Sequence, residues 1–296
     1  MLLHFHEKST YETSRHFFDS TLFVLPLSGR CQEGETRRLI FDTDFVDTCA
    51  ELHARGDKTD VIQWLQVGEE AAHFSESYDA FRKAASVEEP TPAAADDDML
   101  YIMYTSGTTG LPKGVVHTHN TAIWAILTIA ATCDYHDGDV YLGALPMFHV
   151  GALTPLAANV FSGATSVVMR AFDPTLAWEL IEREKVTTGL AVPAMLNFMV
   201  QVGDYENRFD FSSLRWIMTG AAPVPPALTE HYHGLGIGLL QVYGLTETCG
   251  PACVMDPETA LKYPDSTGRS FYFTEVKIVG EDGKECPRGE GGEGWV

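Results

Sequence analysis

The sequence lacks any apolar run long enough to cross a bilayer. Residues 121–132, the longest candidate, are too few for a membrane-spanning helix and are interrupted by threonines. The first ten residues also lack the basic region, the long apolar stretch and the small-residue cleavage site of a signal peptide. These absences predict a cytoplasmic protein without a membrane span. A chain of 296 residues is long enough to bury a substantial core.

Clustered metal ligands are also lacking. The six cysteines contain no C-x-x-C pair, so neither zinc-ligand spacing nor a disulfide framework is indicated, and we expect reduced thiols. Three H-x-H pairs occur, and none has a third ligand at a suitable spacing. We therefore interpret the following residues as surface or loop histidines: His4 and His6, His117 and His119, and His231 and His233.

Positive charge, and lysine in particular, is scarce. The formal net charge is −21, and only eight of the twenty basic residues are lysine. Such an excess of carboxylates repels nucleic acid and anionic membrane surfaces, which argues against both as partners. Because a phosphate ligand is itself an anion, a phosphate site in this chain has to create its own positive potential. Backbone N–H groups, a lysine and a metal ion are the available sources.

Short apolar strands alternate with helices from Leu100 onward. Strands are expected at 100–104, 114–117, 140–145, 164–169, 187–192, 214–219 and 239–243. Helices are expected over 118–131, 151–161 and 173–185. Thr118 or Asn120 is the expected cap of the first helix, and Asp173 followed by Pro174 is the expected start of the third. The alternation predicts an α/β fold with a mainly parallel sheet flanked by helices.

The chain is expected to fall into five regions. They are an atypical amino-terminal segment (1–37), a partial first α/β subdomain (38–87), a polar Pro/Ala/Asp linker (88–99), a main α/β subdomain (100–269) and the start of a β subdomain (270–296). The first subdomain is predicted to contain a strand, a helix and a strand at 39–41, 45–53 and 61–67. In the last region, residues 271–279 are predicted to form a strand that enters a hairpin turn at 281–283.

A glycine- and hydroxyl-rich segment lies between the first two strands of the main subdomain. It runs from Tyr104 to Gly114 with the sequence YTSGTTGLPKG. Small residues let backbone N–H groups and hydroxyls converge on phosphate oxygens, and one lysine adds a mobile positive charge. A Leu-Pro pair separates the last glycine of the run from the lysine, so the segment is not the common P-loop; the alternative is a flexible Gly/Thr turn. The residues predicted to bind phosphate are Thr105, Ser106, Gly107, Thr108, Thr109, Gly110 and Lys113.

Three later segments carry residue types that suit the same chemistry. They are Pro146–His149 (PMFH), Thr219–Pro223 (TGAAP) and Gln241–Glu247 (QVYGLTE). Glu247 is a hard oxygen ligand suited to Mg²⁺. Taken singly, His149 is as readily a core histidine, and TGAAP is as readily a plain strand-to-helix turn. The segments nevertheless follow predicted strands of one α/β unit, and open parallel sheets place their ligand sites there.

Together, the four segments resemble the signature motifs of the adenylate-forming superfamily. This superfamily contains acyl-CoA synthetases, the adenylation domains of non-ribosomal peptide synthetases, and firefly luciferases. The resemblance is close from Leu100 onward. It implies the large amino-terminal domain of the adenylate-forming fold, with mainly parallel sheets flanked by helices and the start of a β-barrel-like subdomain. Region 100–269 would then be the AMP-binding subdomain.

The resemblance implies catalytic roles for four residues. The loop ending at Lys113 would hold the β- and γ-phosphates of ATP, which leave as pyrophosphate. His149 would line the acyl pocket beside the α-phosphate. Thr246 would contact the α-phosphate, and Glu247 would hold Mg²⁺. Positioned donors and a metal stabilise the negative charge that gathers in the transition state, which explains these residue types.

The resemblance implies an adenine site as well. Tyr243 would pack against the adenine ring, with Gly244 beside it, and Gly220, Ala221 and Ala222 would lie along the ring. The implied cofactors are therefore ATP and Mg²⁺, with coenzyme A as co-substrate.

The implied reaction joins a carboxylic acid to AMP and then transfers the acyl group to CoA, releasing AMP and pyrophosphate. We expect an apolar monocarboxylate, either a fatty or an aryl acid, because the predicted pocket contains small residues and no strong positive side chain. A homodimer is compatible with the family. The predicted acyl pocket draws on His149, Val150, Gly151, residues 191–194, residues 219–221 and Leu245.

Two departures from the family's pattern leave alternatives open. Residues 1–36 do not resemble the family's amino-terminal region, and the sequence ends where the family continues into a small carboxy-terminal lid domain. We therefore expect that domain to be absent, and a catalytically incomplete nucleotide-binding fragment is one alternative. A carrier-linked amino-acid adenylation domain is another, although the acidic residue it needs near 191–195 is missing. Luciferase-like oxygenation shares every motif.

Overall fold

The computed structural model describes residues 37–56, 59–68, 70–89, 91–105 and 113–296. This part of the chain divides into two compact units, and the boundary in the sequence lies between Ala93 and Ala94. The first unit has one sheet and the second has three among the described residues, and each unit has its own core, so we describe them separately.

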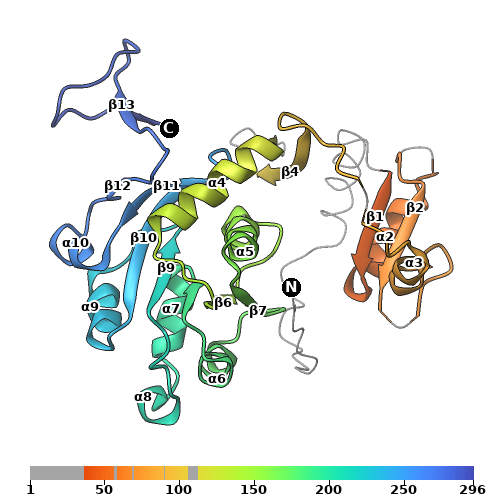
Figure 1. Cartoon of the computed structure of the whole chain (residues 1–296), viewed down its shortest axis with the longest axis horizontal. Helices are drawn as coiled ribbons and strands as arrows, with labels where there is room; N and C mark the ends of the chain where they lie inside the picture. The colour runs from red at the N-terminus through yellow and green to blue at the C-terminus, as the bar shows by residue number, and fades with distance from the viewer. Residues whose placement is uncertain (1–36, 57–58, 69, 90, 106–112) are drawn as a thin grey trace. The chain divides into compact units, whose positions relative to one another are not determined.

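The first unit is a small parallel sheet with two helices and a 3-10 turn (Figure 1). The sheet has the order β1-β2-β3, and Phe41, Leu52 and Trp64 are buried in its core. The strand, helix and strand expected over 39–67 are thereby confirmed. The elements are β1 (Arg38–Asp42), η1 (Thr43–Phe45), α2 (Val46–His53), β2 (Gln63–Val67), β3 (Glu76–Ser77) and α3 (Tyr78–Ala84).

The second unit alternates strands with helices through most of its length. Its strands are β4 (Met99–Thr105), β5 (Lys113–Thr118), β6 (Val140–Gly143), β7 (Thr165–Val168), β8 (Thr188–Leu190), β9 (Trp216–Gly220), β10 (Gly238–Leu245), β11 (Gly250–Met255), β12 (Arg269–Ser270), β13 (Lys277–Val279) and β14 (Glu293–Trp295). Its helices are α4 (His119–Thr132), α5 (Val150–Ser162), α6 (Pro174–Glu184), α7 (Pro193–Val200), α8 (Tyr205–Arg208), α9 (Pro226–Gly234) and α10 (Pro257–Lys262).

Seven of these strands form one sheet with the order β12-β11-β10-β9-β8-β6-β7. The five strands β7, β6, β8, β9 and β10 are parallel, and β11 and β12 add an antiparallel edge. The predicted mainly parallel sheet is confirmed. The antiparallel strand β11 was not expected from the sequence.

Helix boundaries follow the capping residues. The side chain of Asp173 accepts a hydrogen bond from the Leu176 N–H at 2.7 Å, and Pro174 opens α6, as the sequence predicts. Thr118 caps α4 and forms a reciprocal capping box with Thr121. These local preferences determine where each helix leaves its strand.

The helices cover both faces of the sheet (Figure 1). Helices α6, α7 and α9 contribute Trp178, Leu196 and Tyr232 to the large core on one face. Helices α4 and α5 contribute Ile129 and Ala158 to the core on the other face. The chain therefore leaves β6 through α5 on one face and enters β8 from α6 on the opposite face.

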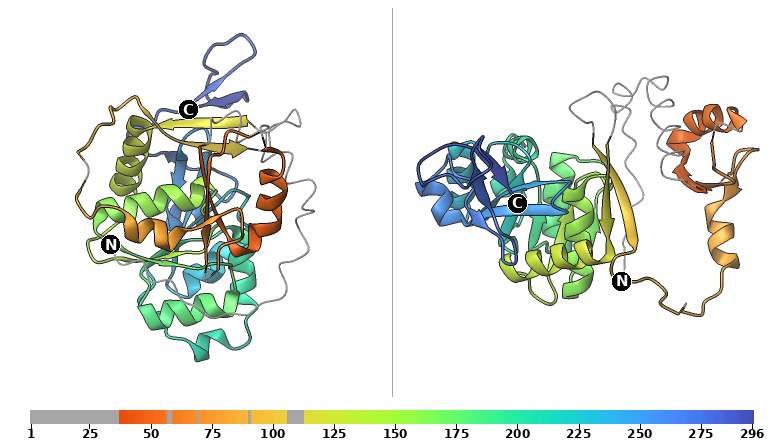
Figure 2. Two further views of the ribbon diagram at one scale, coloured as in Figure 1. Left: turned by 90° about the vertical axis from the view of Figure 1, so that its right-hand side faces the viewer. Right: turned by 90° about the horizontal axis from the view of Figure 1, so that it is seen from above.

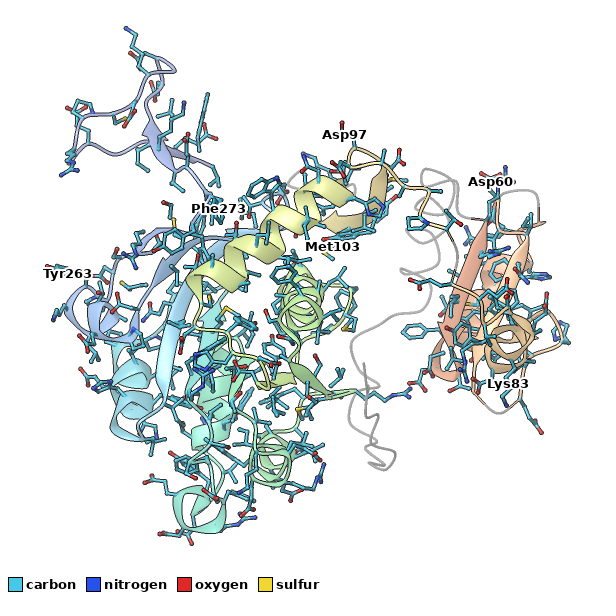
Figure 3. The ribbon with its side chains drawn as sticks, in the orientation of Figure 1. Asp60, Lys83, Asp97, Met103, Tyr263 and Phe273 are labelled. Atoms are coloured by element: carbon cyan, nitrogen blue, oxygen red, sulfur yellow. The ribbon has the colours of Figure 1, made fainter. Side chains whose placement is uncertain are left out.

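Strands β4 and β5 form an antiparallel hairpin of their own rather than part of the parallel sheet (Figure 2). Only residues 106–112 connect them. A parallel pair requires a crossover of a dozen or more residues, so this short connection permits only antiparallel pairing. The side chain of Met103 on β4 is buried (Figure 3).

The strand predicted over 271–279 is wrong over its first six residues. Only Lys277–Val279 is a strand, and it pairs antiparallel with β14. Phe273 interrupts the extended run because its φ of 61° lies in the left-handed region. Its side chain is exposed near the surface residue Tyr272, and its ring contacts Trp124 of α4 (Figure 3).

Membrane-spanning helices are not found in the described ranges, since none of their helices combines the necessary length with the necessary apolar character.

An ion pair with a buried carboxylate and a partly exposed arginine joins the amino-terminal ends of β6 and β9. Asp139, immediately before β6, is almost fully buried and lies 2.7 Å from the Arg215 guanidinium. Burial alone favours the neutral acid. The hydrogen bonds from the His136 N–H, Arg215 and the Thr187 hydroxyl outweigh that effect and lower the pKa of Asp139 below its ordinary value.

We predict that Asp139→Asn lowers the free energy of unfolding by about 2 kcal/mol at pH 7, because it leaves Arg215 without its buried carboxylate. Because the pKa of Asp139 is lower in the folded protein than its value of about 3.9 in the unfolded chain, the ionised carboxylate stabilises the fold fully above about pH 4. This stabilisation is lost as the pH falls from there through the folded-state pKa. Urea unfolding should therefore show the difference from wild type shrinking below about pH 4. The control is Asp134→Asn, which removes an exposed partner of the same arginine. An equal loss in both variants would contradict the prediction.

Candidate functional site

The carboxyl ends of four neighbouring parallel strands define the candidate site. Strands β10, β9, β8 and β6 are consecutive in the sheet, so their ends span about 14 Å at ordinary strand spacing. The chain leaves β6 through α5 on one face and leaves β8 through α7 on the opposite face, so a topological switch point lies between these two adjacent strands. Open α/β sheets bind ligands at such points. The segments that follow these strands include His149, Ala191, Ala221 and Glu247.

His149 follows β6 and caps the amino-terminal end of α5. Its Nδ1 accepts a hydrogen bond from the Gly151 N–H at 3.0 Å. In the neutral ring the proton is then on Nε2, which leaves that nitrogen as a donor. His149 is exposed, and so are the preceding Met147 and Phe148. The alternative interpretation as a core histidine is therefore wrong.

Gly220 and Ala221 form the turn after β9. A Cβ on Gly220 would lie 2.2 Å from the carbonyl oxygen of Val242 on β10, so only glycine permits the two backbones to approach this closely. Ala221 has a φ of 65°, in the left-handed region. The two residues that follow it, Ala222 and Pro223, are exposed. A non-glycine residue in this region costs about 1 kcal/mol, so the turn is a locally strained backbone segment.

The Tyr243–Glu247 segment ends β10 and enters the turn before β11. A Cβ on Gly244 would lie 2.2 Å from the Gly250 carbonyl oxygen, which explains the glycine at this position. Tyr243 is 38% exposed, and Glu247 is exposed. Thr246 is half-buried beside it. An aromatic ring, a hydroxyl and a carboxylate are thus presented at one edge of the sheet.

The β4–β5 hairpin carries the two ends of the predicted phosphate loop. Thr105 and Lys113 are the outermost paired residues of the hairpin, and Lys113 is exposed. The other predicted phosphate-binding residues lie outside the described residues: Ser106, Gly107, Thr108, Thr109 and Gly110.

A hydrogen bond joins this hairpin to the Tyr243–Glu247 segment. His117 on β5 lies with its Nε2 2.9 Å from the carbonyl oxygen of Thr246. The histidine is only 2% exposed, so its interpretation as a surface or loop histidine is wrong. Burial lowers its pKa below the ordinary value, and the Thr246 carbonyl and Glu247 offset part of that shift.

Two further residues hold the turn after Glu247, and sequence reasoning missed both. The Tyr101 hydroxyl lies 3.3 Å from the Cys249 Sγ, and the Thr154 hydroxyl donates to the Cys249 carbonyl oxygen at 3.0 Å. Tyr101 and His117 are cross-strand partners on β4 and β5. The alternation of inward-facing and outward-facing residues along each strand was a sequence signal that could have indicated that both side chains face inward. Thr154, in the middle of an apolar helix, gave no such signal.

Glu247 is chemically suited to Mg²⁺, but it has no prebuilt set of protein ligands. Among the described residues, no group of three or more His, Cys, Asp or Glu side chains is arranged to bind a metal ion. Magnesium is commonly held by one or two carboxylates together with substrate phosphates and water. The residues present therefore fit a metal that arrives with a nucleotide rather than a resident structural ion.

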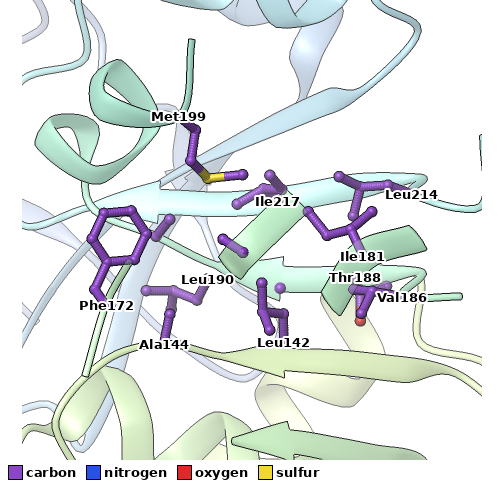
Figure 4. A pocket seen from close by; sticks show the side chains of 13 residues that line it. Leu142, Ala144, Phe172, Ile181, Val186, Thr188, Leu190, Met199, Leu214 and Ile217 are labelled. Atoms are coloured by element: carbon purple, nitrogen blue, oxygen red, sulfur yellow. The ribbon is translucent and has the colours of Figure 1, made fainter. Parts of the chain in front are cut away.

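The predicted acyl pocket does not coincide with the apolar cavity in Figure 4. That cavity, of about 20 Å³, is lined by core residues such as Leu142, Phe172 and Ile181. Of the predicted acyl-pocket residues it includes only Ala191. A space of this size holds about one water molecule. The cavity is thus a packing defect of the core, and the acyl pocket stays a prediction.

A doubly wound, mainly parallel sheet with close glycine turns, a threonine and a carboxylate at its carboxyl edge is typical of α/β proteins that bind ligands at this edge. Comparison with known proteins specifies the class. The chain belongs to the AMP-binding enzyme family, whose sequence pattern matches residues 27–296.

Named relatives and solved structures agree with this assignment. The chain is 44% identical over 209 residues to the long-chain-fatty-acid–CoA ligase FadD13 of Mycobacterium tuberculosis, covering 71% of this chain and 41% of the ligase. The inhibitor-bound amino-terminal domain of FACL13 from the same organism superposes with a TM-score of 0.84 at 37% identity, covering 90% of this chain and 65% of that one.

A second solved structure is more distant in sequence. The o-succinylbenzoate CoA synthetase of Bacillus subtilis in complex with ATP and magnesium has a TM-score of 0.77 at 29% identity, covering 92% of this chain and 52% of that chain. The present chain thus spans less than two thirds of the length of each of these proteins.

We predict that Gly220→Ala destabilises the protein by about 3 kcal/mol, because the added Cβ forces β9 away from β10. Urea unfolding measures the loss. The matched control is Gly234→Ala at the end of α9, where a Cβ would meet nothing within 4 Å. That change should be neutral or stabilising by up to about 1 kcal/mol. Equal stability of the two variants would show that β9 and β10 do not approach as described.

Proposed function

We propose that this chain binds ATP·Mg²⁺ at the carboxyl edge of its sheet and activates a carboxylic acid as an acyl-adenylate, for transfer to CoA. One observation carries the proposal: the hairpin that bears Lys113 is hydrogen-bonded through His117 to Thr246, the neighbour of Glu247. This contact supports the proposal that the hairpin bearing Lys113 and the turn bearing Glu247 belong to one site. Membership of the AMP-binding enzyme family supports the same reaction.

Each residue has a chemical task in this proposal. The backbone N–H groups of the loop and Lys113 neutralise the β- and γ-phosphates. Thr246 donates its hydroxyl to an α-phosphate oxygen, and Glu247 orients the metal. Tyr243 supplies a flat surface for adenine beside the turn at Gly220. Mg²⁺, when bound, offsets phosphate charge and polarises the phosphoryl oxygens.

The two half-reactions need little proton transfer before the thiol step. A substrate carboxylate oxygen forms a bond to the α-phosphorus while the bond to pyrophosphate breaks. The thiol of CoA loses its proton to water, and the thiolate attacks the acyl carbonyl carbon, forming the thioester bond while the bond to the phosphate oxygen breaks and AMP leaves. Catalysis by this chain is therefore mainly positioning and charge stabilisation, which suits a site made of fixed backbone turns. We propose His149 Nε2 as a donor to the acyl group, because its Nδ1 already accepts a hydrogen bond from the Gly151 N–H.

An apolar monocarboxylate is the proposed acid. The segment that follows β8, including Ala191, Val192 and Met195, offers no carboxylate to pair with an amino group. The relatives reported above are named for a long-chain fatty acid and for o-succinylbenzoate, and neither is an amino acid. Because o-succinylbenzoate carries two carboxylates, the proposal of a single carboxylate rests on the predicted pocket, which has no strong positive side chain. These observations favour fatty or aryl acids over an amino-acid substrate.

We predict that Lys113→Ala and Glu247→Gln each weaken ATP·Mg²⁺ binding about tenfold, which corresponds to about 1.4 kcal/mol. Both residues are exposed, so the melting temperature should not change. Titration calorimetry with and without EDTA measures the effect, and removal of Mg²⁺ should weaken the wild type but not Glu247→Gln. The controls are Lys262→Ala and Glu230→Gln, two exposed residues on other elements. Unchanged affinity in both site variants would contradict the proposal.

We predict that stable acyl-sulfamoyl adenosines report the substrate class without turnover. Dodecanoyl and cinnamoyl derivatives should bind at least about a hundredfold more tightly than AMP. The reason is that such analogues of the acyl-adenylate make the contacts of the nucleotide and those of the acyl group at the same time. Glycyl and phenylalanyl derivatives should gain little over AMP. Preferential binding of the aminoacyl derivatives would instead support a carrier-linked amino-acid adenylation domain.

A further inference from the structure

The turn that carries Glu247 is held by its own hydrogen bonds. The Thr248 hydroxyl donates to the Leu245 carbonyl oxygen at 3.0 Å, and the Cys249 N–H donates to the Thr246 carbonyl oxygen at 3.0 Å. Cys249 has a φ of 57°, which is costly for a residue with a Cβ. Such a conformation persists only where surrounding groups determine it.

Three separate elements supply those surrounding groups. From β5, His117 reaches the Thr246 carbonyl oxygen at 2.9 Å. From β4, the Tyr101 hydroxyl reaches the Cys249 Sγ at 3.3 Å. From α5, the Thr154 hydroxyl donates to the Cys249 carbonyl oxygen at 3.0 Å. The Thr246 carbonyl can only accept, so the histidine Nε2 carries the proton in this contact.

The contacts from the hairpin form one unit. Tyr101 and His117 are paired across β4 and β5, and their ring centroids lie 5.0 Å apart. They contact the turn at two points, on either side of Glu247. Lys113 lies four residues from His117 on the same strand, about 13 Å along it. A shift of the hairpin relative to the turn therefore breaks both contacts at once.

We propose that His117 and Thr154 are positioning residues for the Thr246–Glu247 turn, and that His117 fixes the hairpin strand that carries Lys113 relative to this turn. The proposal rests on the proposed function for its consequence in ATP binding. Neither residue touches the nucleotide; each acts through a backbone carbonyl of the turn. Both are almost fully buried, so water does not replace the lost donor readily.

Three variants and one matched control test this inference on the whole chain. His117→Leu removes the donor, and His117→Gln restores an N–H close to the position of Nε2. Thr154→Val removes the other donor while keeping its shape, and it provides a second test if His117→Leu fails to fold. The control is Tyr232→Phe, which deletes an equally buried hydrogen bond to a backbone carbonyl, that of Leu196, outside the turn.

Amide hydrogen exchange gives a readout that needs no ligand. We expect the Cys249 amide to exchange about tenfold faster in His117→Leu and in Thr154→Val, and within about twofold of wild type in His117→Gln. Tyr232→Phe should lose global stability without a selective change at Cys249. Unchanged exchange at Cys249 in both donor-loss variants overturns the positioning role, whatever the nucleotide affinity.

Nucleotide binding gives the second readout. We expect His117→Leu to lose about tenfold in ATP·Mg²⁺ affinity, which is about 1.4 kcal/mol, and His117→Gln to recover it. Faster exchange at Cys249 with full ATP·Mg²⁺ affinity would overturn the claim that the position of the turn affects nucleotide binding. If the wild type does not bind ATP·Mg²⁺ and exchange still responds as expected, the proposed function fails while the positioning of the turn is supported.

Discussion

The hydrogen bond from His117 to the Thr246 carbonyl oxygen is the contact on which the site depends. Among the described residues, the hairpin β4–β5 shares no strand pairing with the seven-stranded sheet. Its position relative to β10 therefore depends on its direct connection to α4 and on contacts such as that of His117 with Thr246. A buried donor that loses its acceptor pays the full desolvation cost, typically about 1–3 kcal/mol. This asymmetry favours one arrangement of the hairpin against the turn that carries Glu247.

The second constraint is the close approach of backbones at the carboxyl edge. Gly220 on β9 and Gly244 on β10 would each bring a Cβ to 2.2 Å from a carbonyl oxygen of the neighbouring strand. The absence of side chains therefore has a packing cause in the folded protein, independent of any ligand. The same two positions lie in the predicted adenine site. Glycine there permits the close approach of the strands, and it would also leave room for a flat ligand beside Tyr243.

The sequence predicted the parallel sheet, the capped helices and the location of the motifs at strand ends, because hydrophobic periodicity and capping residues are local signals. It did not predict that β4 and β5 form a separate hairpin, although the seven-residue connection excluded a parallel crossover. The burial of His117 and the role of Thr154 also escaped prediction. Their partners are more than ninety residues away in sequence, and only tertiary structure brings them together.

The central claim is that the phosphate loop and the Tyr243–Glu247 segment contact one magnesium nucleotide. Paramagnetic broadening tests it most directly: ATP is bound with Mn²⁺ in place of Mg²⁺, and the amide signals of Lys113, Thr246 and Glu247 are recorded against the Mg²⁺ complex. We predict strong broadening at all three residues and none at Glu230 on the surface of α9. Broadening confined to Lys113, or spread without preference over the acidic surface, would contradict the account.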